Sequence, residues 1–186
     1  MLRLHPFQQD SRLQGIVLEG HLRWVGDQLQ LQFRLQGPQE DLVCPSQTAT
    51  AQRLDGLWQS TCLEAFFAIP GEAHYWEFNL SPSGDWNLYR LEEYRQGLRQ
   101  EQGMGISAIS LEKEVLGNAV QLKAEVALDL GETLRAEKTL EGSLTAVIEQ
   151  KGVGCSFWAL QHCGEEADFH RRESFTLGLQ KEAPSA

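Results

Sequence analysis

The chain has 186 residues, a hydrophobic content of 41% and a formal net charge of -10 at pH 7. A chain of this length suits one domain, which buries roughly 70% of the surface that its unfolded form exposes. The acidic balance argues against a nucleic-acid partner, because phosphates require a basic protein surface. It also disfavours an anionic membrane surface. We therefore expect neither nucleic acid nor membrane as a partner.

Hydropathy along the chain predicts a cytoplasmic protein. The opening residues, Met1 to Pro6, lack the apolar segment of a signal peptide. No run approaches the ~20 apolar residues that span a bilayer. The four cysteines show no CxxC spacing. We expect free thiols, with Cys62 and Cys155 packed as small hydrophobic groups.

Apolar and polar residues alternate over most of the chain, which is typical of half-buried strands. The clearest cases are Leu29 to Leu35 and Val120 to Leu128, where every second residue is apolar. Helical periodicity is scarce, and only 91–99 and 132–138 predict short helical turns. In chain order, the sequence predicts strands over 13–19, 21–25, 29–35, 62–69, 74–81, 86–91, 105–111, 120–128, 143–149, 154–160 and 173–179.

This succession of elements predicts an all-β fold. About ten short strands with frequent turn signals and no alternation with helices indicate an antiparallel β-sandwich, immunoglobulin-like or jelly roll, with one or two short helical turns. Residues 37–56 are polar and aperiodic, so we expect a long loop that covers an edge or mouth of the sandwich. The prediction is one domain over 1–180 and a flexible tail over 181–186.

Polar residues occupy one face of two adjacent predicted strands. If these strands pair as a hairpin around Pro70 and Gly71, Glu64 lies opposite the region of Glu77 and Asn79, with directly opposed side chains ~5 Å apart. Two buried carboxylates at that separation repel, so a cation, a proton, an arginine or ligand hydroxyls must neutralise one of them. Arg53, Arg90 and Arg95 are the arginines nearby in sequence. The alternative is a solvated outer face, or structural pairing with an arginine.

Such a face suits a small polar ligand such as a sugar. Carboxylates and amides bind vicinal hydroxyls, while aromatic rings stack on the apolar face of a pyranose. Trp58, Trp86 and Tyr89 are the expected stacking platforms, whereas Trp76 and Trp24 are expected to pack in the interior and Trp158 fits either role. The predicted ligand-binding residues are Arg53, Trp58, Glu64, Glu77, Asn79, Trp86, Tyr89 and His170.

Signals for catalysis and for metal binding are weak. His162, Asp168 and His170, together with Cys163, include groups that can bind metals, but their spacing does not demand convergence. No nucleotide-binding, zinc-protease, calcium-loop or nucleophile-elbow motif occurs. Paired carboxylates can hydrolyse glycosides, but only when they flank the bond, which neighbours on one flat sheet face rarely do. We expect no enzyme activity, no metal and no cofactor.

Two blocks of the sequence resemble a known group. The first covers 57–95, and the second includes Phe157-Trp158-Ala159-Leu160-Gln161-His162, then Asp168-Phe169-His170 and Ser174-Phe175. Both are similar to DOMON-like proteins related to family-nine carbohydrate-binding modules. The resemblance implies a bacterial β-sandwich that binds a small ligand, which is a sugar in the carbohydrate-binding relatives and haem in the cytochrome relatives. Those haem sites use a methionine and a histidine, and the single internal methionine here is Met104, in a glycine turn.

The leading hypothesis is a non-catalytic, cytoplasmic bacterial module that binds a small polar ligand, most plausibly a saccharide. The alternatives are a haem or redox carrier, a protein-interaction module without a small ligand, and a hydrolase that depends on Glu64 or Glu77.

Overall fold

Strands dominate the structure, as the alternating sequence predicts. The computed structural model describes residues 1–184, and within that range the helices are single 3-10 turns, η1 (Ser11–Leu13), η2 (Leu57–Gln59) and η3 (Arg172–Ser174). None of these helices has the length and apolar composition needed to cross a membrane. The strands are β1 (Leu2–Arg3), β2 (His5–Pro6), β3 (Val17–Val25), β4 (Gln28–Pro38), β5 (Cys62–Ala68), β6 (Tyr75–Leu80), β7 (Trp86–Leu91), β8 (Arg99–Gln100), β9 (Gly105–Leu116), β10 (Ala119–Asp129), β11 (Thr139–Gln150), β12 (Gly154–Ala159) and β13 (Leu177–Glu182).

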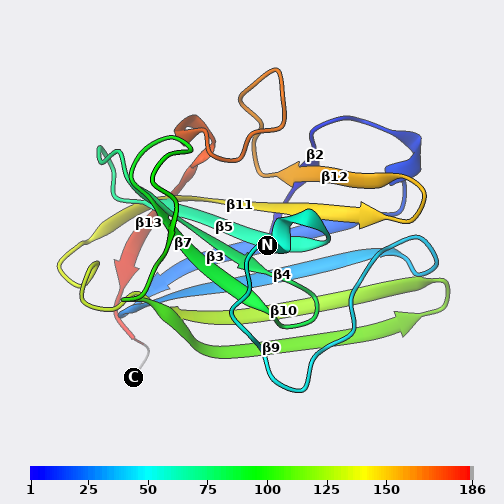
Figure 1. The fold of residues 1–186 in the computed structure, drawn as a ribbon, viewed down its shortest axis with the longest axis horizontal. Coiled ribbons are helices and arrows are strands. Elements are labelled where there is room, and N and C mark those ends of the chain that lie inside the picture. The colour runs from blue at the N-terminus through cyan, green and yellow to red at the C-terminus, as the bar shows by residue number, and fades with distance from the viewer. Residues whose placement is uncertain (185–186) are drawn as a thin grey trace.

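The strands form two layers (Figure 1). The first layer has the order β9-β10-β4-β3, with β1 paired to β3, and the second has the order β8-β7-β6-β5-β11, followed by β12 and β2. Strand β13 joins the layers, because it pairs antiparallel with β11 and then parallel with β3. Every other pair of named strands is antiparallel.

Strand β11 shares one of its edges between two partners. Residues 139–142 pair with β13, and residues 145–150 pair with β12, while β5 occupies the opposite edge. The chain between β12 and β13 must therefore leave the sheet, and it folds over the outer face of the second layer. This segment, residues 160–176, is called the covering segment below.

The hydrophobic core lies between the two layers. Alternation points Leu31 and Phe33 of the first layer towards Phe67 and Trp76 of the second, and all four side chains are almost fully buried. Burial of large apolar side chains at this interface supplies the main stabilising free energy, about 25 cal/mol for each Å² removed from water. The prediction of an all-β sandwich is confirmed.

Several predicted boundaries are wrong for identifiable reasons. Residues 17–25 form one continuous strand because Gly20 lies where the layers approach closely; a Cβ there would be 2.6 Å from Leu144 Cδ1. Strand β13 continues through Lys181 and Glu182, which the sequence analysis placed in the tail, because both residues pair with β3. The remainder of that predicted tail includes 185–186, which lie outside the described residues.

The predicted helical turns do not form in either place. Residues 92–98 make a tight loop closed by a bridge between Glu93 and Gln96, in which Arg95 has a φ of 54°. Residues 131–136 form turns between β10 and β11. The 3-10 turns occur elsewhere, at η1, η2 and η3. Single turns of this kind are fixed by local packing and caps, so periodicity cannot reveal them.

The long loop predicted over 37–56 is largely confirmed. Strand β4 ends at Pro38, and the chain then runs along the sandwich to η2, with isolated bridges from Leu42 to Gln150 and from Arg53 to Trp86. Its backbone also bonds to a turn between β6 and β7, where Thr48 N donates to Ser83 O at 2.9 Å. These contacts place the loop against the edges of the second layer.

Strands β5 and β6 are buried on both faces, which distinguishes them from the other strands. Their inner residues belong to the main core, while their outer residues contact a smaller cluster of Phe66, Tyr75, Tyr89 and Phe175. This second cluster exists because the covering segment and the 92–98 loop pack over the sheet. The candidate site lies under this cover.

Two glycines with similar backbone conformations offer a test of the packing between turns. Gly131 has a φ of +58°, and a Cβ there would be 2.1 Å from the carbonyl oxygen of Gly103, whereas Gly117 has a φ of +64° and nothing within 4 Å. Gly117→Ala should cost about 1 kcal/mol through backbone strain alone. Gly131→Ala should cost about 1–2 kcal/mol more, because a backbone carbonyl must move. Urea unfolding of both variants checks this, and equal losses would contradict the close approach.

Candidate functional site: a cleft over two buried carboxyl groups

A cleft of ≈ 380 Å³ opens over the outer face of the second layer. Its floor comes from β5, β6 and β11, and its walls come from η2, β12, the 92–98 loop and the covering segment. The floor residues are Glu64, Phe66, Glu77 and Val147, and the wall residues include Trp58, Arg95, Leu98, Phe157, Phe169 and His170.

Strand pairing brings the two carboxyl groups together. Glu64 is paired with Asn79, and Phe66 is paired with Glu77, so the carboxyl groups lie diagonally on one face, as predicted. Glu64 is 2% exposed and Glu77 is 6% exposed. The alternative of a solvated outer face is therefore wrong, because the covering segment and η2 shield this face from bulk water.

Each carboxyl group has one hydrogen bond from a neighbouring polar side chain. Thr145 Oγ1 donates to Glu64 Oε2 at 3.1 Å, and Asn79 Nδ2 donates to Glu77 Oε1 at 2.9 Å. These donors come from the strands on either side, β11 and β6, and alternation places them on the same face. The second oxygen of each carboxyl group is left for the cleft.

Burial sets the protonation state of the pair. Loss of hydration raises the pKa of Glu64 to about 8, and the nearby charge of Glu77 adds to the effect. Burial also raises the pKa of Glu77, although the Asn79 amide and Arg95 partly offset this. Because the two groups interact, the protons belong to the pair and not to either residue alone. At least one carboxyl group is therefore neutral near pH 7.

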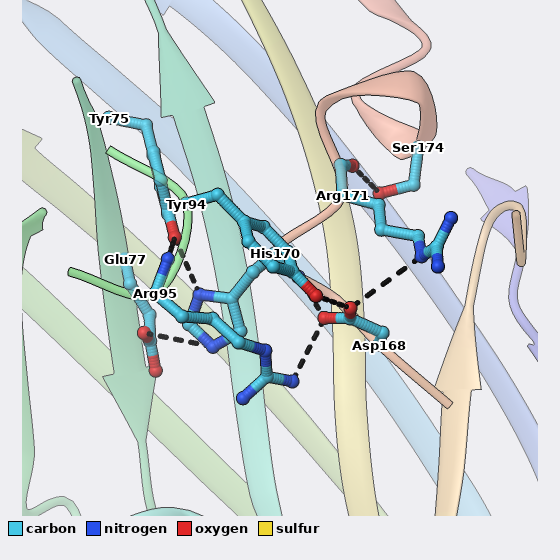
Figure 2. A network of polar contacts seen from close by, with 8 residues as sticks. All are labelled: Tyr75, Glu77, Tyr94, Arg95, Asp168, His170, Arg171 and Ser174. Atoms are coloured by element: carbon cyan, nitrogen blue, oxygen red, sulfur yellow. Dashed lines mark hydrogen bonds and ion pairs between the residues drawn. The ribbon is translucent and has the colours of Figure 1, made fainter. Parts of the chain in front are cut away.

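His170 contacts Tyr75 through one ring nitrogen and faces Glu77 with the other (Figure 2). The backbone N–H of Arg95 donates to the Tyr75 hydroxyl at 3.2 Å, and this hydroxyl is 2.8 Å from His170 Nδ1. The other ring nitrogen, Nε2, is 4.0 Å from Glu77 Oε2. Burial and the charge of Arg95 lower the pKa of His170 to about 4, so the ring is neutral.

Asp168 holds the rim of the cleft in place (Figure 2). Its carboxylate accepts from Arg95 Nη2 at 2.9 Å, from the Tyr94 hydroxyl and from the backbone N–H of His170 at 3.1 Å. Burial alone would raise the pKa of Asp168, but these hydrogen bonds outweigh burial and lower it. Arg95 is thereby tied to the rim and not to the carboxyl pair on the floor.

Aromatic rings form the walls. Trp58, on η2, is 39% exposed, and its ring contacts Tyr89 edge to face at 5.8 Å. Phe157 of β12 is 41% exposed and lies 6.1 Å from Phe169, which in turn lies 6.4 Å from Phe66. Exposed rings above a polar floor can stack on an apolar ligand face while the floor binds its polar groups.

The structure brings together half of the predicted ligand-binding residues. Trp58, Glu64, Glu77 and His170 all line the cleft. Asn79 is fully buried beside Glu77, and its side-chain amide donates a hydrogen bond that orients the Glu77 carboxyl group on the floor.

Tyr89 lies behind Trp58, with its hydroxyl donating to Asp55 at 2.7 Å. Its ring therefore supports the Trp58 wall, and neither Tyr89 nor Asn79 is among the cleft-lining residues.

Arg53 and Trp86 lie away from the cleft. Trp86 is paired with Leu80 and packs against Phe78, on the core side of β7. The guanidinium of Arg53 lies over the Trp86 ring at 5.0 Å and donates to Asn87 Oδ1 at 2.8 Å. Side chains alternate between the two faces of β7, so Trp86 and Tyr89 point to opposite faces. This difference could have been read from the sequence.

The remaining tryptophans, two of the cysteines and Met104 lie outside the cleft. Trp76, Trp24 and Trp158 are all in the core. Cys62 is buried as expected, but Cys155 is exposed at the end of β11 and β12, so the prediction that it packs in the interior is wrong. Met104 packs into the core and lines no part of the cleft.

The loop histidines are held by hydrogen bonds. His162 Nε2 contacts His5 O at 2.9 Å, and His170 contacts Tyr75 as described. Among the described residues, no group of three or more histidine, cysteine or acidic side chains converges as a metal site would require.

Sequence reasoning did not identify the apolar walls. Phe157 and Phe169 come from β12 and the covering segment, far along the chain from Glu64. The available signal was Phe66, a large apolar residue on an otherwise polar face, which requires an apolar partner above the sheet. Only the tertiary structure shows which segment provides it.

Comparison with known proteins gives structural similarity alone. No protein-family model and no curated protein matches the chain. A candidate carbohydrate-binding protein from Bacteroides uniformis has a TM-score of 0.62 at 13% identity, over 97% of this chain and 87% of that chain. A family 9 carbohydrate-binding module from Caldicellulosiruptor kristjanssonii in complex with cellotriose has a TM-score of 0.51 at 12% identity, over 98% of this chain and 82% of that chain.

The same kind of module in complex with glucose has a TM-score of 0.49 at 13% identity, over 97% of this chain and 82% of that chain. The likeness to the Bacteroides protein and to the cellotriose complex, at TM-scores of 0.62 and 0.51, shows a shared fold alone. The predicted resemblance to family-nine modules thus extends to the fold, and its DOMON part stays a prediction.

The raised pKa of Glu64 makes stability depend on pH. The folded protein holds a proton that the unfolded chain releases near its ordinary pKa of 4.5, so stability falls as pH rises from there to about 8. Glu64→Gln removes this loss, and it should stabilise the protein by on the order of 2 kcal/mol at pH about 8 and by little at pH about 4.

Thermal and urea unfolding at both pH values measures this effect. Glu114→Gln, at an exposed position of β9, is the matched control and should change neither value. Parallel pH profiles for the wild type and Glu64→Gln would show that burial does not perturb this carboxyl group.

Proposed function

We propose that the protein is a non-catalytic binding module for a small saccharide, which it binds in the cleft over Glu64 and Glu77. The observation that carries the proposal is the combination of two buried carboxyl groups on the floor with the exposed rings of Trp58 and Phe157 above them. Hydroxyl groups can both donate to and accept from such carboxyl groups, and the rings can stack on a pyranose.

The structural neighbours support a carbohydrate. The Bacteroides protein is described as carbohydrate-binding, and the Caldicellulosiruptor module holds cellotriose. Their identity to this chain is low, so the support lies in the shared sandwich and in the independent chemistry of the cleft. The cleft volume of ≈ 380 Å³ suits one or two sugar units.

The placement of the carboxyl groups favours binding over hydrolysis. Glu64 and Glu77 rise from the same sheet face, so both approach a ligand from one side. Glycosidases place an acid and a second carboxylate on opposite sides of the scissile bond. Each carboxyl group is also held by a neutral donor, Thr145 or Asn79, which fixes its orientation.

Loss of the Trp58 ring should weaken sugar binding. Wild-type affinity is expected between micromolar and millimolar, because sugar hydroxyls exchange hydrogen bonds with water. Trp58→Ala should raise Kd about tenfold, since the stacked face is lost. Leu116→Ala, at an exposed position of β9, is the control and should bind normally.

The measurement is isothermal titration against a panel of neutral, amino and acidic mono- and disaccharides. Circular dichroism of each variant confirms that it is folded. A folded wild-type protein that binds no member of the panel would refute the proposed function.

A further inference from the structure

The carboxyl pair on the cleft floor lacks a cationic partner within the described chain. Arg95, which lines the wall of the cleft, is bound to Asp168 at the rim. Arg53 lies alongside β7, and Arg90 belongs to that strand; their guanidinium groups cover the rings of Trp86 and Trp76. The imidazole of His170 is neutral and 4.0 Å from Glu77.

Each carboxyl group nonetheless has unused capacity to accept hydrogen bonds. Glu64 Oε2 accepts from Thr145, and Glu77 Oε1 accepts from Asn79. The Cys62 thiol also interacts with Glu64, but within residues 1–184 no lysine or arginine lies within 4.0 Å of either carboxyl group. Both side chains are more than nine-tenths buried, and both line the cleft. A cation that entered the cleft would find two adjacent acceptors.

We propose that the saccharide bound in this cleft carries a protonated amine, which pairs with Glu64 and Glu77. This inference rests on the proposed function and specifies its ligand as an amino sugar. A primary ammonium group has three donors, enough to engage both carboxylates at once. Charge-assisted hydrogen bonds of this kind are about twice as strong as neutral ones.

The surroundings favour an organic cation over a metal ion. Metal sites need three or more converging ligands, and the described residues offer no such group. The aromatic walls, by contrast, attract an ammonium group through their faces and pack against the ring that carries it. Trp58 and Phe157 are exposed aromatic residues that line the same cleft as the carboxyl pair.

A second cleft extends the site beyond one sugar unit. It has a volume of ≈ 330 Å³ and shares Phe157 and Ala167 with the first. Its charged lining residues are Asp10, Glu165 and Glu166. Asp10 is paired with Arg12, whereas Glu165 and Glu166 have no ion-pair partner within the described residues. The second unit of an amino-sugar oligosaccharide would thus meet Glu165 and Glu166, so disaccharides are suitable probes.

Binding of an amine should release a proton. In the free protein at least one of the two carboxyl groups is protonated near neutral pH, because burial raises both pKa values. The ammonium group stabilises both carboxylates, so the displaced proton passes to the buffer while the amine keeps its own proton below about pH 7. Affinity should therefore rise with pH by up to about tenfold for each unit below pH 7.

Other titratable groups around the pair do not change charge in this range. Burial raises the pKa of Cys62, of Tyr75 to about 12, and of Tyr89. From the loops above, Arg95 stays charged, while Asp168 and His170 have lowered pKa values. The proton must accordingly come from Glu64 and Glu77.

The test compares three β-1,4-linked disaccharides, of glucosamine, N-acetylglucosamine and glucose, which differ only at the second carbon. Isothermal titration between about pH 5.5 and about pH 7, in two buffers of different ionisation enthalpy, counts the protons released. We expect the glucosamine dimer to bind at least about tenfold tighter than the glucose dimer, with proton release for the amine alone.

Glu77→Gln removes one carboxylate and should reduce the preference for glucosamine over glucose to less than about threefold. Glu114→Gln should leave the preference unchanged. Glu64→Gln, which should be more stable than the wild type, serves as the second variant if Glu77→Gln does not fold.

The outcomes separate the two proposals. If the glucose dimer binds as tightly as the glucosamine dimer and no proton is released, the amine inference is overturned and the saccharide function stands. If none of the disaccharides or the wider panel binds, both are overturned.

Discussion

The candidate site depends on the burial of the outer face of β5 and β6. A sandwich needs only its inner faces covered, yet here Glu64 and Glu77 are almost as buried as the core. Burying a carboxyl group without a cation is unfavourable unless it takes up a proton or receives hydrogen bonds. Thr145 and Asn79 supply one bond each, and protonation supplies the rest. The covering segment, the rim network and the aromatic walls together shield this face from bulk water.

The rim shows how charge is distributed within the site. Asp168 gathers Tyr94, Arg95 and the backbone of His170 around one carboxylate that stays ionised. The floor, a short distance away, keeps two carboxyl groups without a cation. If the Arg95 guanidinium were paired with Glu64 or Glu77 on the floor, its charge would offset that carboxylate and its side chain would occupy the cleft. Because Asp168 holds that arginine, the acidic floor remains open to a ligand, and the neutral His170 adds no competing charge.

Much of this could be predicted from the sequence, because alternation reports the faces of strands directly. It identified the core of β4 and β10, the hairpin of β5 and β6, and the position of Glu64 opposite the region of Glu77 and Asn79. It failed where contacts are made between distant segments. Phe157 and Phe169 reach the cleft only through the course of the covering segment, and Trp86 was assigned by its nearness to a strand end although its parity places it in the core. The single-turn helices have no periodicity to detect.

The split edge of β11 has a mechanical consequence. The covering segment begins where β12 leaves this strand and ends where β13 returns to it, while Thr145 of the same strand bonds to the cleft floor. The floor and the wall formed by the covering segment are thus anchored to one strand, whereas η2 and the 92–98 loop supply the other walls. Anchoring at both ends limits the conformations open to the covering segment, so less ordering entropy is lost on association than a free loop would lose.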